Sequence, residues 1–370
     1  MSSTRLTYRR APYGTEFLGE GASSIVFKSI EVETGKTVAL KMSRVSTRVG
    51  RPTLQHETRI IRLLKGHASI PCVHAYGQLG HFKYMAMEIL GPSVAKQQKK
   101  NGARTEVIEP GAQLAGLEHI HSLGILHRDI KHESLLCGLD DSTIKIIDFG
   151  LSKPISHGPP NKYDPLKDCK TLVGSPYWAS LHSHNGVDLA PRDDLESLAY
   201  IALFLLLGHL PWKPRSRLEP RVRSQEIIRL MKSSCSGKGL SSGFPVEFGD
   251  LLDYSCSIDF DQLPDYRSFR RLFTALPEAM SDGPLDWSPC DPQTTTCILD
   301  EPQLDIPGFD ENSDPDDDDY AFAAENSYFE MDISMLERQR ERDKDLLPVE
   351  RELYLDSCTP LIVQVGRESC

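Results

Sequence analysis

The pattern of apolar and polar positions divides the first 280 residues into a strand-rich part and a helical part. Ser24–Ile30 and Thr37–Met42 flank a Glu-Thr-Gly turn, which predicts two paired strands. Apolar side chains recur at helical spacing in Arg51–Lys65, which predicts one helix after them. From about Gly91 to Leu276 helical spacing dominates. We therefore expect an α+β protein with two lobes: a small β-rich lobe containing one helix, and a larger, mainly helical lobe.

The composition changes after Leu276. Ser281–Asp319 is rich in Pro and Asp, which predicts a disordered segment. From Ser281 onward there are 24 of the 53 acidic residues but only 6 of the 42 basic ones, so a mildly basic body carries an acidic tail. We predict an N-terminal extension at residues 1–11, one domain at 12–278 with lobes at 12–88 and 91–278, and an acidic, low-order tail at 279–370.

Composition also bounds the class of protein. The chain has 370 residues, of which 39% are hydrophobic and 26% charged, and these values are typical of a globular protein. The nine cysteines form no CxxC pair, which favours reduced thiols in an intracellular protein, cytoplasmic or nuclear. The longest apolar run, Leu198–Leu207, is far shorter than the roughly 20 residues that span a bilayer, so it predicts a buried helix. We expect a monomer with neither a membrane nor a nucleic acid as partner.

A glycine-rich stretch, LGEGASSIVF, contains Gly19 and Gly21 between the first predicted strands. Glycines allow backbone N–H groups to approach a phosphate closely, although this motif alone more often marks an ordinary hairpin turn. Lys41 ends the next strand in VALK, and Glu57 lies within the predicted helix. A lysine so placed would hold phosphates and pair with the glutamate, but either residue taken singly is more often a surface residue.

Two later motifs make the pattern specific. ILHRDIKHESLL contains Asp129, a candidate base for a substrate hydroxyl, and Lys131, which would neutralise a moving phosphoryl group. IIDFG follows a β-branched strand and places Asp148 as a magnesium ligand. Because both motifs occur in order downstream of Gly19, Gly21 and Lys41, they predict transfer of the γ-phosphate of ATP. Lys131 and Ser175, in VGSPYW, favour Ser or Thr as acceptor over Tyr.

One position departs from this pattern. A catalytic-loop asparagine that binds a second metal ion is expected five residues after Asp129, where this chain has Ser134. A serine hydroxyl is shorter and a poorer magnesium ligand than an amide carbonyl. Two interpretations remain open: a weakened kinase in which Ser134 reaches the second metal ion through water, or a pseudokinase that binds nucleotide or partners without turnover. A small-molecule kinase is a third class, and Ser175 argues against it.

The sequence resembles the eukaryotic protein kinase superfamily and, within it, most resembles the casein kinase 1 family. Three stretches carry the closer resemblance: Met87–Val94, Arg192–Trp212 and Gly243–Phe273, the last with the turn Pro264–Tyr266. The resemblance covers about residues 12–278. It does not extend to the family's anion-binding arginine, whose position is occupied by Tyr177.

The resemblance implies the remaining site residues. Adenine would lie between Val26 and Ala39 on one side and Leu136 and Ile147 on the other. The backbones of Glu88 and Leu90 would meet the adenine edge, with Met87 as gatekeeper. The full set of residues implied to bind ATP is Leu18, Gly19, Gly21, Val26, Ala39, Lys41, Met87, Glu88, Leu90, Leu136 and Ile147. The cofactors are then ATP and Mg²⁺, the metal residues Asp148 and Ser134, and the partners protein substrates with Ser or Thr acceptors.

Three histidines and one aspartate complete the expectations. His127 is expected to pack near Phe149 and not to carry a proton. Asp194 is implied by the resemblance to brace the catalytic loop from below. His182 and His184 lie in a polar loop, and we assign neither of them as a ligand.

Overall fold

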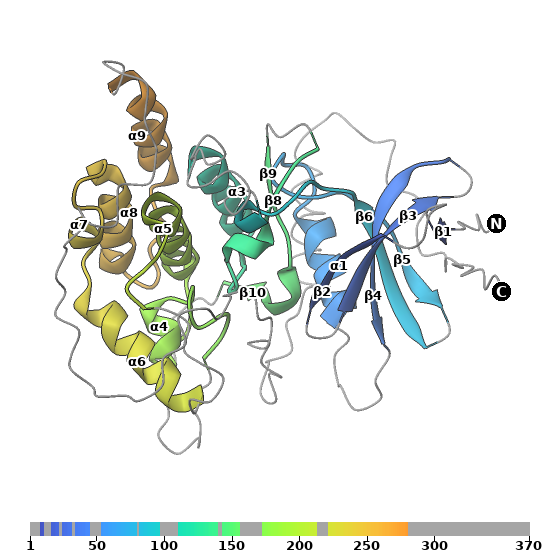
Figure 1. The fold of residues 1–370 in the computed structure, drawn as a ribbon, viewed down its shortest axis with the longest axis horizontal. Coiled ribbons are helices and arrows are strands. Elements are labelled where there is room, and N and C mark those ends of the chain that lie inside the picture. The colour runs from blue at the N-terminus through green and yellow to red at the C-terminus, as the bar shows by residue number, and fades with distance from the viewer. Residues whose placement is uncertain are drawn as a thin grey trace.

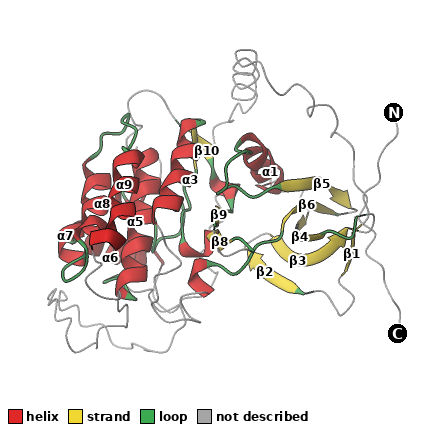
Figure 2. Ribbon diagram, turned by 90° about the horizontal axis from the view of Figure 1, so that it is seen from above, coloured by secondary structure: helices red, strands yellow, loops and turns green. Residues whose placement is uncertain are grey.

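A computed structural model describes residues 8–10, 16–21, 24–31, 34–44, 53–79, 81–96, 110–139, 143–155, 172–212 and 221–279. These residues form two lobes, a β-sheet lobe on the right of Figure 1 and a helical lobe on the left. The view from above in Figure 2 shows the same separation of strands from helices. The predicted two-lobed α+β fold is therefore confirmed. The predicted tail at 279–370 lies outside the described residues except for Ala279, which ends the last described helix.

The N-lobe is built on a six-stranded antiparallel sheet. Its order is β1-β3-β4-β6-β5, and β2 also pairs with β3. The strands are β1 (Tyr8–Arg10), β2 (Phe17–Gly21), β3 (Ser24–Glu31), β4 (Thr37–Arg44), β5 (Val73–Leu79) and β6 (Phe82–Glu88). The two predicted strands, Ser24–Ile30 and Thr37–Met42, are confirmed as β3 and β4. Their pairing places Val26 opposite Lys41, so the glycine-rich hairpin and the lysine share one part of the sheet.

One helix, α1 (Thr53–Leu63), packs against β5 and β6. Its apolar side chains at helical spacing, among them Leu54, Ile60 and Ile61, are buried in the core. The predicted helix at 51–65 is confirmed, and the observed helix is shorter than predicted at both ends. Figures 1 and 2 show α1 between the sheet and the helical lobe, and the helix also contacts Phe149–Leu151 of that lobe.

The described part of the C-lobe is mainly helical and has two short antiparallel ladders, one of two residue pairs and one of three. Its helices are α3 (Pro110–Ser122), α4 (Leu181–His184), α5 (Pro191–Leu207), α6 (Arg221–Ser234), α7 (Gly237–Leu240), α8 (Val246–Ser257) and α9 (Tyr266–Ala279). Its strands are β7 (Ile125–Leu126), β8 (Leu135–Cys137), β9 (Ile144–Ile146) and β10 (Lys153–Pro154), and its 3-10 turns are η2 (His132–Ser134) and η3 (Phe149–Leu151). The pairs β8–β9 and β7–β10 carry the loops of the site.

Helix α5 forms the centre of the C-lobe. It begins with Pro191 in its first turn, where a missing N–H costs nothing, and the Asp193 carboxylate accepts the N–H of Ala190. It ends at Gly208, whose φ of 77° is the left-handed geometry that suits glycine. Nearly all of its side chains are buried, and it packs on α8, α3 and α4. The prediction that Leu198–Leu207 forms a buried helix is confirmed.

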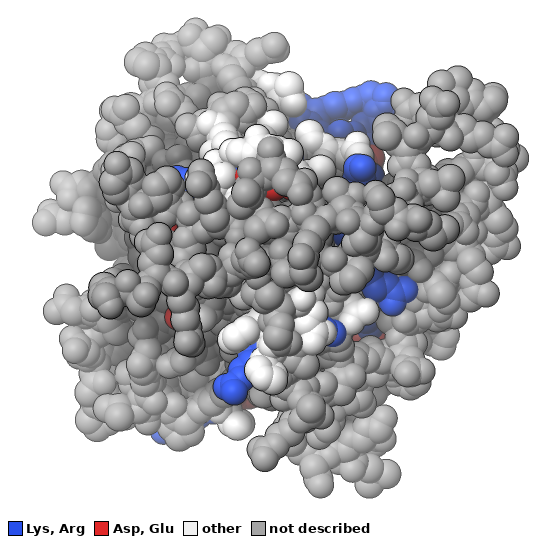
Figure 3. All heavy atoms as spheres, turned by 90° about the vertical axis from the view of Figure 1, so that its right-hand side faces the viewer, with Lys and Arg blue, Asp and Glu red and all other residues white. Residues whose placement is uncertain are grey.

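None of the described helices combines the length and the apolar character needed to cross a membrane. Figure 3 views the end of the N-lobe and shows Lys and Arg atoms of described residues on this face.

The burial of α5 predicts where the C-lobe is most sensitive to truncation. Leu198 is fully buried, so Leu198→Ala should lower the free energy of unfolding by about 2–5 kcal/mol through lost packing and a residual cavity. Leu272 on α9 is 45% exposed, so Leu272→Ala should change the free energy of unfolding by less than about 0.5 kcal/mol. Urea denaturation followed by circular dichroism measures both. Equal losses in the two variants would contradict the central role of α5.

Candidate active site

The glycine-rich hairpin joins β2 to β3. Gly19 lies opposite Val26, and a Cβ atom added at Gly19 would meet no atom within 4 Å. Packing within the described protein therefore does not require a glycine here. Because Gly19 has no side chain, its backbone N–H is accessible to a ligand, as in phosphate-binding turns.

Lys41 connects the two lobes through two carboxylates. Its Nζ lies 2.8 Å from both oxygens of Glu57 on α1 and 3.3 Å from Oδ1 of Asp148. The Glu57 side chain is 4% exposed, whereas that of Asp148 is 41% exposed. Lys41 is thus held by the buried carboxylate of Glu57, whereas the carboxylate of Asp148 is partly exposed to solvent.

Charge fixes the protonation of this group of three. Burial alone would lower the pKa of Lys41, but the negative charges of Glu57 and Asp148 raise it above its ordinary range. Lys41 lowers the pKa of Asp148 to about 2 against the effect of burial, so this carboxylate is ionised at neutral pH. Burial raises the pKa of Glu57, and the Lys41 charge opposes that rise. The result is a fixed cation beside an available carboxylate.

The catalytic loop takes its shape from Asp194 on α5. Its Oδ2 accepts the N–H of His127 at 2.7 Å, and its Oδ1 accepts the N–H of Arg128 at 2.8 Å. Arg128 has a φ of 71°, in the left-handed region that a non-glycine residue occupies only at a cost. The structure thus confirms that Asp194 braces this loop. It also confirms that His127 packs on Phe149, with ring centroids 4.8 Å apart.

Asp129 is held through both of its carboxylate oxygens. Oδ1 accepts hydrogen bonds from the N–H of Ser175 at 2.9 Å and from its hydroxyl at 2.8 Å. Oδ2 lies 3.3 Å from Nζ of Lys131. Burial would lower the pKa of Lys131, but Asp129 and Asp148 raise it, so Lys131 stays cationic. The structure therefore brings Asp129, Lys131 and Ser175 together, although 46 residues separate Asp129 from Ser175 along the chain.

Ser134 lies inside the catalytic loop and is 1% exposed. Its hydroxyl donates to the carbonyl of Lys131 at 2.8 Å and accepts the N–H of Lys131 at 3.1 Å. A hydroxyl has one hydrogen and two acceptor lone pairs, so these two bonds use most of its capacity. Ser134 therefore braces the loop, and its role as a metal ligand remains a prediction.

The residues expected around adenine come from both lobes. Ala39 and Met87 are cross-strand partners on β4 and β6 and belong to the buried core. Leu18, Val26 and Ile147 are partly buried and pack against the same core, and Leu136 is half-buried on β8 opposite Lys145. Apolar side chains that are only partly covered suit the flat faces of a heterocycle.

The segment that joins the lobes is braced at Glu88. The Glu88 N–H donates to the carbonyl of Cys72 at 2.8 Å, and its carboxylate accepts the N–H of Cys72 at 2.9 Å. Nζ of Lys145, on β9, lies 3.3 Å from the same carboxylate. Leu90 follows two residues later, and the N–H of Gly91 bonds the carbonyl of Cys137 on β8. The connection between the lobes is therefore fixed to strands on both sides.

The residues present fit a nucleotide with a divalent cation. The open backbone at Gly19, the fixed cation of Lys41 and the ionised carboxylate of Asp148 match a phosphate and its metal in charge. Asp148 also has a left-handed φ of 69°, strain of the kind that concentrates at functional sites. Asp148 would hold the metal and Lys41 the phosphates.

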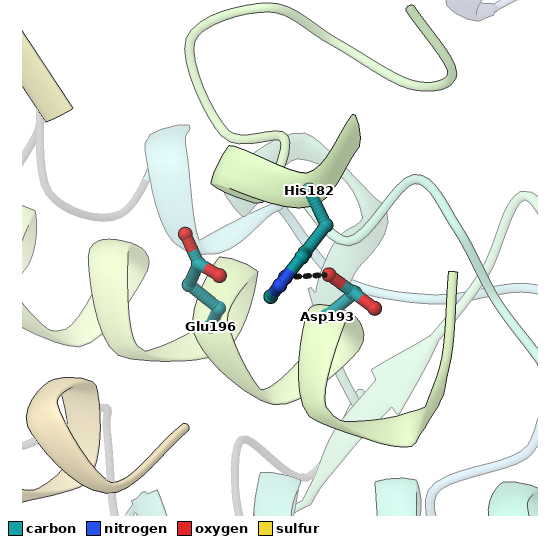
Figure 4. Close-up of side chains that lie close together, drawn as sticks. All are labelled: His182, Asp193 and Glu196. Atoms are coloured by element: carbon teal, nitrogen blue, oxygen red, sulfur yellow. Dashed lines mark hydrogen bonds and ion pairs between the residues drawn. The ribbon is translucent and has the colours of Figure 1, made fainter. Parts of the chain in front are cut away.

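A second group of possible metal ligands lies elsewhere in the C-lobe. His182, Asp193 and Glu196 place their ligand atoms within 4.8 Å of one another, and Figure 4 shows His182 pointing toward Asp193. Asp193 caps α5, and Glu196 accepts hydrogen bonds from the N–H of Leu181 and the hydroxyl of Tyr200. These bonds explain the group as part of the fold, and we assign no metal to it.

Two lobes joined so that Lys41 of one meets Asp148 of the other define the class of two-lobed phosphotransferases. Residues 14–262 match a family model described as "Protein kinase domain". The chain therefore belongs to the protein kinase family. It is a kinase domain, a class of transferase that acts on proteins and generally uses ATP with Mg²⁺.

Sequence motifs located the chemistry but not its supports. Of the predicted site residues, Lys41 contacts both Glu57 and Asp148, and Asp129 contacts Lys131. The braces at Lys145 and Cys72 were not predicted. Nothing in the sequence around Lys145 indicates that it contacts Glu88, 57 residues earlier in the chain. The same is true of Cys72, which lies 16 residues before Glu88.

The Lys41–Glu57 pair predicts a pH-dependent loss of stability. Lys41→Met leaves Glu57 buried without its cation, which should lower the free energy of unfolding by about 3 kcal/mol at pH 7.5. Without Lys41, burial and the Asp148 charge raise the pKa of Glu57 further above its ordinary value of 4.5. A carboxyl whose pKa is raised by folding loses stability as pH rises above that ordinary value, so the variant should lose less at pH 5.

Urea denaturation at pH 5 and pH 7.5 measures this difference. The matched control is Lys41→Met with Glu57→Gln, in which the buried side chain has no charge and the pH dependence should disappear. A loss from Lys41→Met that is equal at the two pH values would contradict the pairing.

Proposed function

We propose that this chain is an ATP-dependent serine/threonine protein kinase similar to the casein kinase 1 family. It would transfer the γ-phosphate of Mg-ATP to Ser or Thr hydroxyls of protein substrates. The observation that carries the proposal is the assembled pair of charge groups: Asp129 held between Ser175 and Lys131, and Lys41 held between Glu57 and Asp148.

Each side chain has a role that its contacts support. Asp129 accepts the proton of the attacking hydroxyl, since one carboxylate oxygen is oriented by Ser175 and the other is near Lys131. Lys131 offsets negative charge that develops on the transferred group. Lys41, fixed by Glu57, holds the phosphates, and Asp148 holds the metal. Magnesium, when bound, neutralises phosphate charge and orients the γ-phosphate.

The adenine would occupy the partly covered apolar surface between the lobes. Val26 and Ala39 would lie on one face of the ring, and Leu136 and Ile147 on the other. The backbones of Glu88 and Leu90 would bond its edge beside Met87. The braces on Glu88 from Cys72 and Lys145 support this assignment, because a rigid connection keeps the backbone groups in register with a ligand.

The stretch Gly243–Phe273, on which the resemblance to the casein kinase 1 family rests, reaches the site through the last described helix. The turn Pro264–Tyr266 begins α9, and the hydroxyl of Tyr266 is hydrogen-bonded to Nδ1 of His121. Nε2 of His121 lies 2.9 Å from Oδ2 of Asp194, the carboxylate that holds the catalytic loop. The segment that carries the resemblance is thus connected to the site by two hydrogen bonds.

A pseudokinase is the second candidate, and Ser134 is the observation that favours it. Its hydroxyl is buried and bonded to its own loop, so the second metal position has one ligand fewer than a carbonyl-bearing asparagine would give. Lys41, Glu57, Asp129, Lys131 and Asp148 all remain in place, which favours a working but slow kinase over a binding module.

Phosphate transfer distinguishes the two candidates. We expect wild type to transfer the γ-phosphate of ATP to a generic Ser/Thr protein substrate in the presence of Mg²⁺. Asp148→Ala should lower the rate by roughly a hundredfold or more, because it removes the metal ligand. Ser134→Asn should raise it, because the amide oxygen restores a ligand. Radiolabelled phosphate incorporation at equal concentrations of folded protein is the measurement.

The outcomes separate the readings. Wild-type transfer that Asp148→Ala abolishes supports the kinase. Transfer seen only in Ser134→Asn identifies the native chain as a pseudokinase, and no transfer from any variant would overturn the proposed enzyme.

Acceptor preference is a separate expectation. Ser175 bonds Asp129 beside Lys131, so peptides that differ only in their acceptor should be phosphorylated in the order Ser or Thr well above Tyr, by at least roughly tenfold. Initial rates with three matched peptides give the comparison. Equal rates on Tyr would refute the serine/threonine assignment while leaving the kinase reaction intact.

A further inference from the structure

Helix α6 buries a lysine that the proposed chemistry does not use. Lys232 is 4% exposed, and its Nζ donates to the carbonyl of Pro176 at 3.1 Å and to that of Ala179 at 2.6 Å. It also lies 4.7 Å from the ring centroid of Tyr200 and 5.3 Å from that of Trp212. A buried lysine is costly unless its N–H groups find acceptors, and here both acceptors belong to one turn of the chain.

That turn, residues 175–179, is bonded by two further side chains. Nε1 of Trp212 donates to the carbonyl of Tyr177 at 3.0 Å, and Nε2 of His184 lies 2.9 Å from the carbonyl of Pro176. Burial lowers the pKa of His184 to about 3, so the ring is neutral, and a proton on Nε2 makes it a donor. Side-chain donors from α6, from α4 and from the segment after α5 therefore bond three carbonyls of this turn, those of Pro176, Tyr177 and Ala179.

The same turn carries the partner of Asp129. The N–H groups of Trp178 and Ala179 donate to the carbonyl of Ser175 at 2.9 and 2.8 Å, which closes the turn. Ser175 in turn donates twice to Oδ1 of Asp129. Just before it, Gly174 has a φ of +87°, and a Cβ there would lie 2.6 Å from the carbonyl of Arg128. The turn thus sits directly on the catalytic loop, and its position sets that of Ser175.

We propose that Lys232 is a positioning residue of the kinase reaction, holding the turn at residues 175–179 so that Ser175 orients the Asp129 carboxylate. The proposal rests on the proposed function. Lys232 touches neither substrate nor cofactor in this scheme and acts only through the turn.

The chemistry of an amine suits this role in either protonation state. Burial lowers the pKa of Lys232 to about 7, while the charge of Glu196 opposes the shift. A neutral amine keeps two N–H bonds, which equals the number of carbonyls that it meets. Methionine has similar bulk and no donor, so Lys232→Met tests the hydrogen bonds with little change of packing.

The experiment is a double-mutant cycle combined with amide exchange on the full chain. Lys232→Met, Ser175→Ala and the double variant are compared with wild type for kcat and for the KM of ATP. Lys238→Met is the matched control, because Lys238 is exposed on α7. Hydrogen exchange by mass spectrometry follows the amides of residues 173–181, a readout that needs no catalysis.

We expect Lys232→Met to lower kcat by about ten- to a hundredfold, since small displacements of a catalytic group are costly, with the KM of ATP within about twofold of wild type. Exchange at residues 173–181 should accelerate in this variant and stay unchanged in Lys238→Met. In the Ser175→Ala background, Lys232→Met should lower kcat by a smaller factor than in wild type, because Ser175→Ala removes one of the two hydrogen bonds through which the turn orients Asp129 and leaves the backbone N–H bond.

Additive losses of kcat, or exchange at residues 173–181 equal to that of wild type, would overturn the proposal. If Lys232→Met does not fold, Lys232→Gln replaces it in the cycle, since an amide retains two N–H donors. Its loss of kcat should be smaller and again less than additive with that of Ser175→Ala, and additive losses there would overturn the proposal equally. Absence of transfer in wild type is the failure of the proposed function, and the exchange measurement then decides the role of Lys232 alone.

Discussion

A single buried carboxylate sets the backbone geometry on which the site depends. Asp194 lies on α5, whose side chains are nearly all buried, and accepts the N–H groups of two successive residues, His127 and Arg128, together with a hydrogen bond from His121. Burial would raise the pKa of Asp194, but these bonds lower it, so the charge is kept inside the protein. The left-handed backbone at Arg128 is unfavourable by itself, and these hydrogen bonds offset its cost. Asp129 is the next residue in the chain, so the direction in which its side chain points depends on Asp194 of helix α5.

Much of the fold follows from local pattern. The strand pattern around a Glu-Thr-Gly turn predicted β3 and β4, helical spacing predicted α1, and the long apolar run predicted the core of α5. Such patterns are visible because the burial of one face, or of all faces, of an element determines which neighbouring residues are apolar. The contact of Lys41 with Glu57 was also predictable, since their motifs occur in order with Asp129 and Asp148. The family match at residues 14–262 agrees with that inference.

Long-range supports were beyond local pattern. Lys232 lies in a polar stretch of α6 that resembles any exposed helix, yet it reaches acceptors 53 and 56 residues earlier in the chain. The bond between His121 and Tyr266 spans 145 residues. Spacing in a sequence reports which face of one element is buried, and it contains no information about which distant polar group meets a given side chain. The burial of the Ser134 hydroxyl within its loop is of the same kind, because it depends on how η2 turns.

The bonds from Asp194 to the catalytic loop are made to backbone N–H groups, and every non-proline residue has such a group. The carboxylate therefore holds the course of the loop without regard to which side chains the loop displays. Side chains at residues 127 and 128 can therefore differ while the bonds that fix the backbone at these two positions are preserved. The path of the loop backbone and the chemistry of the loop side chains are thus set by different interactions. The same backbone can therefore belong to catalysts of very different speed and to domains that only bind.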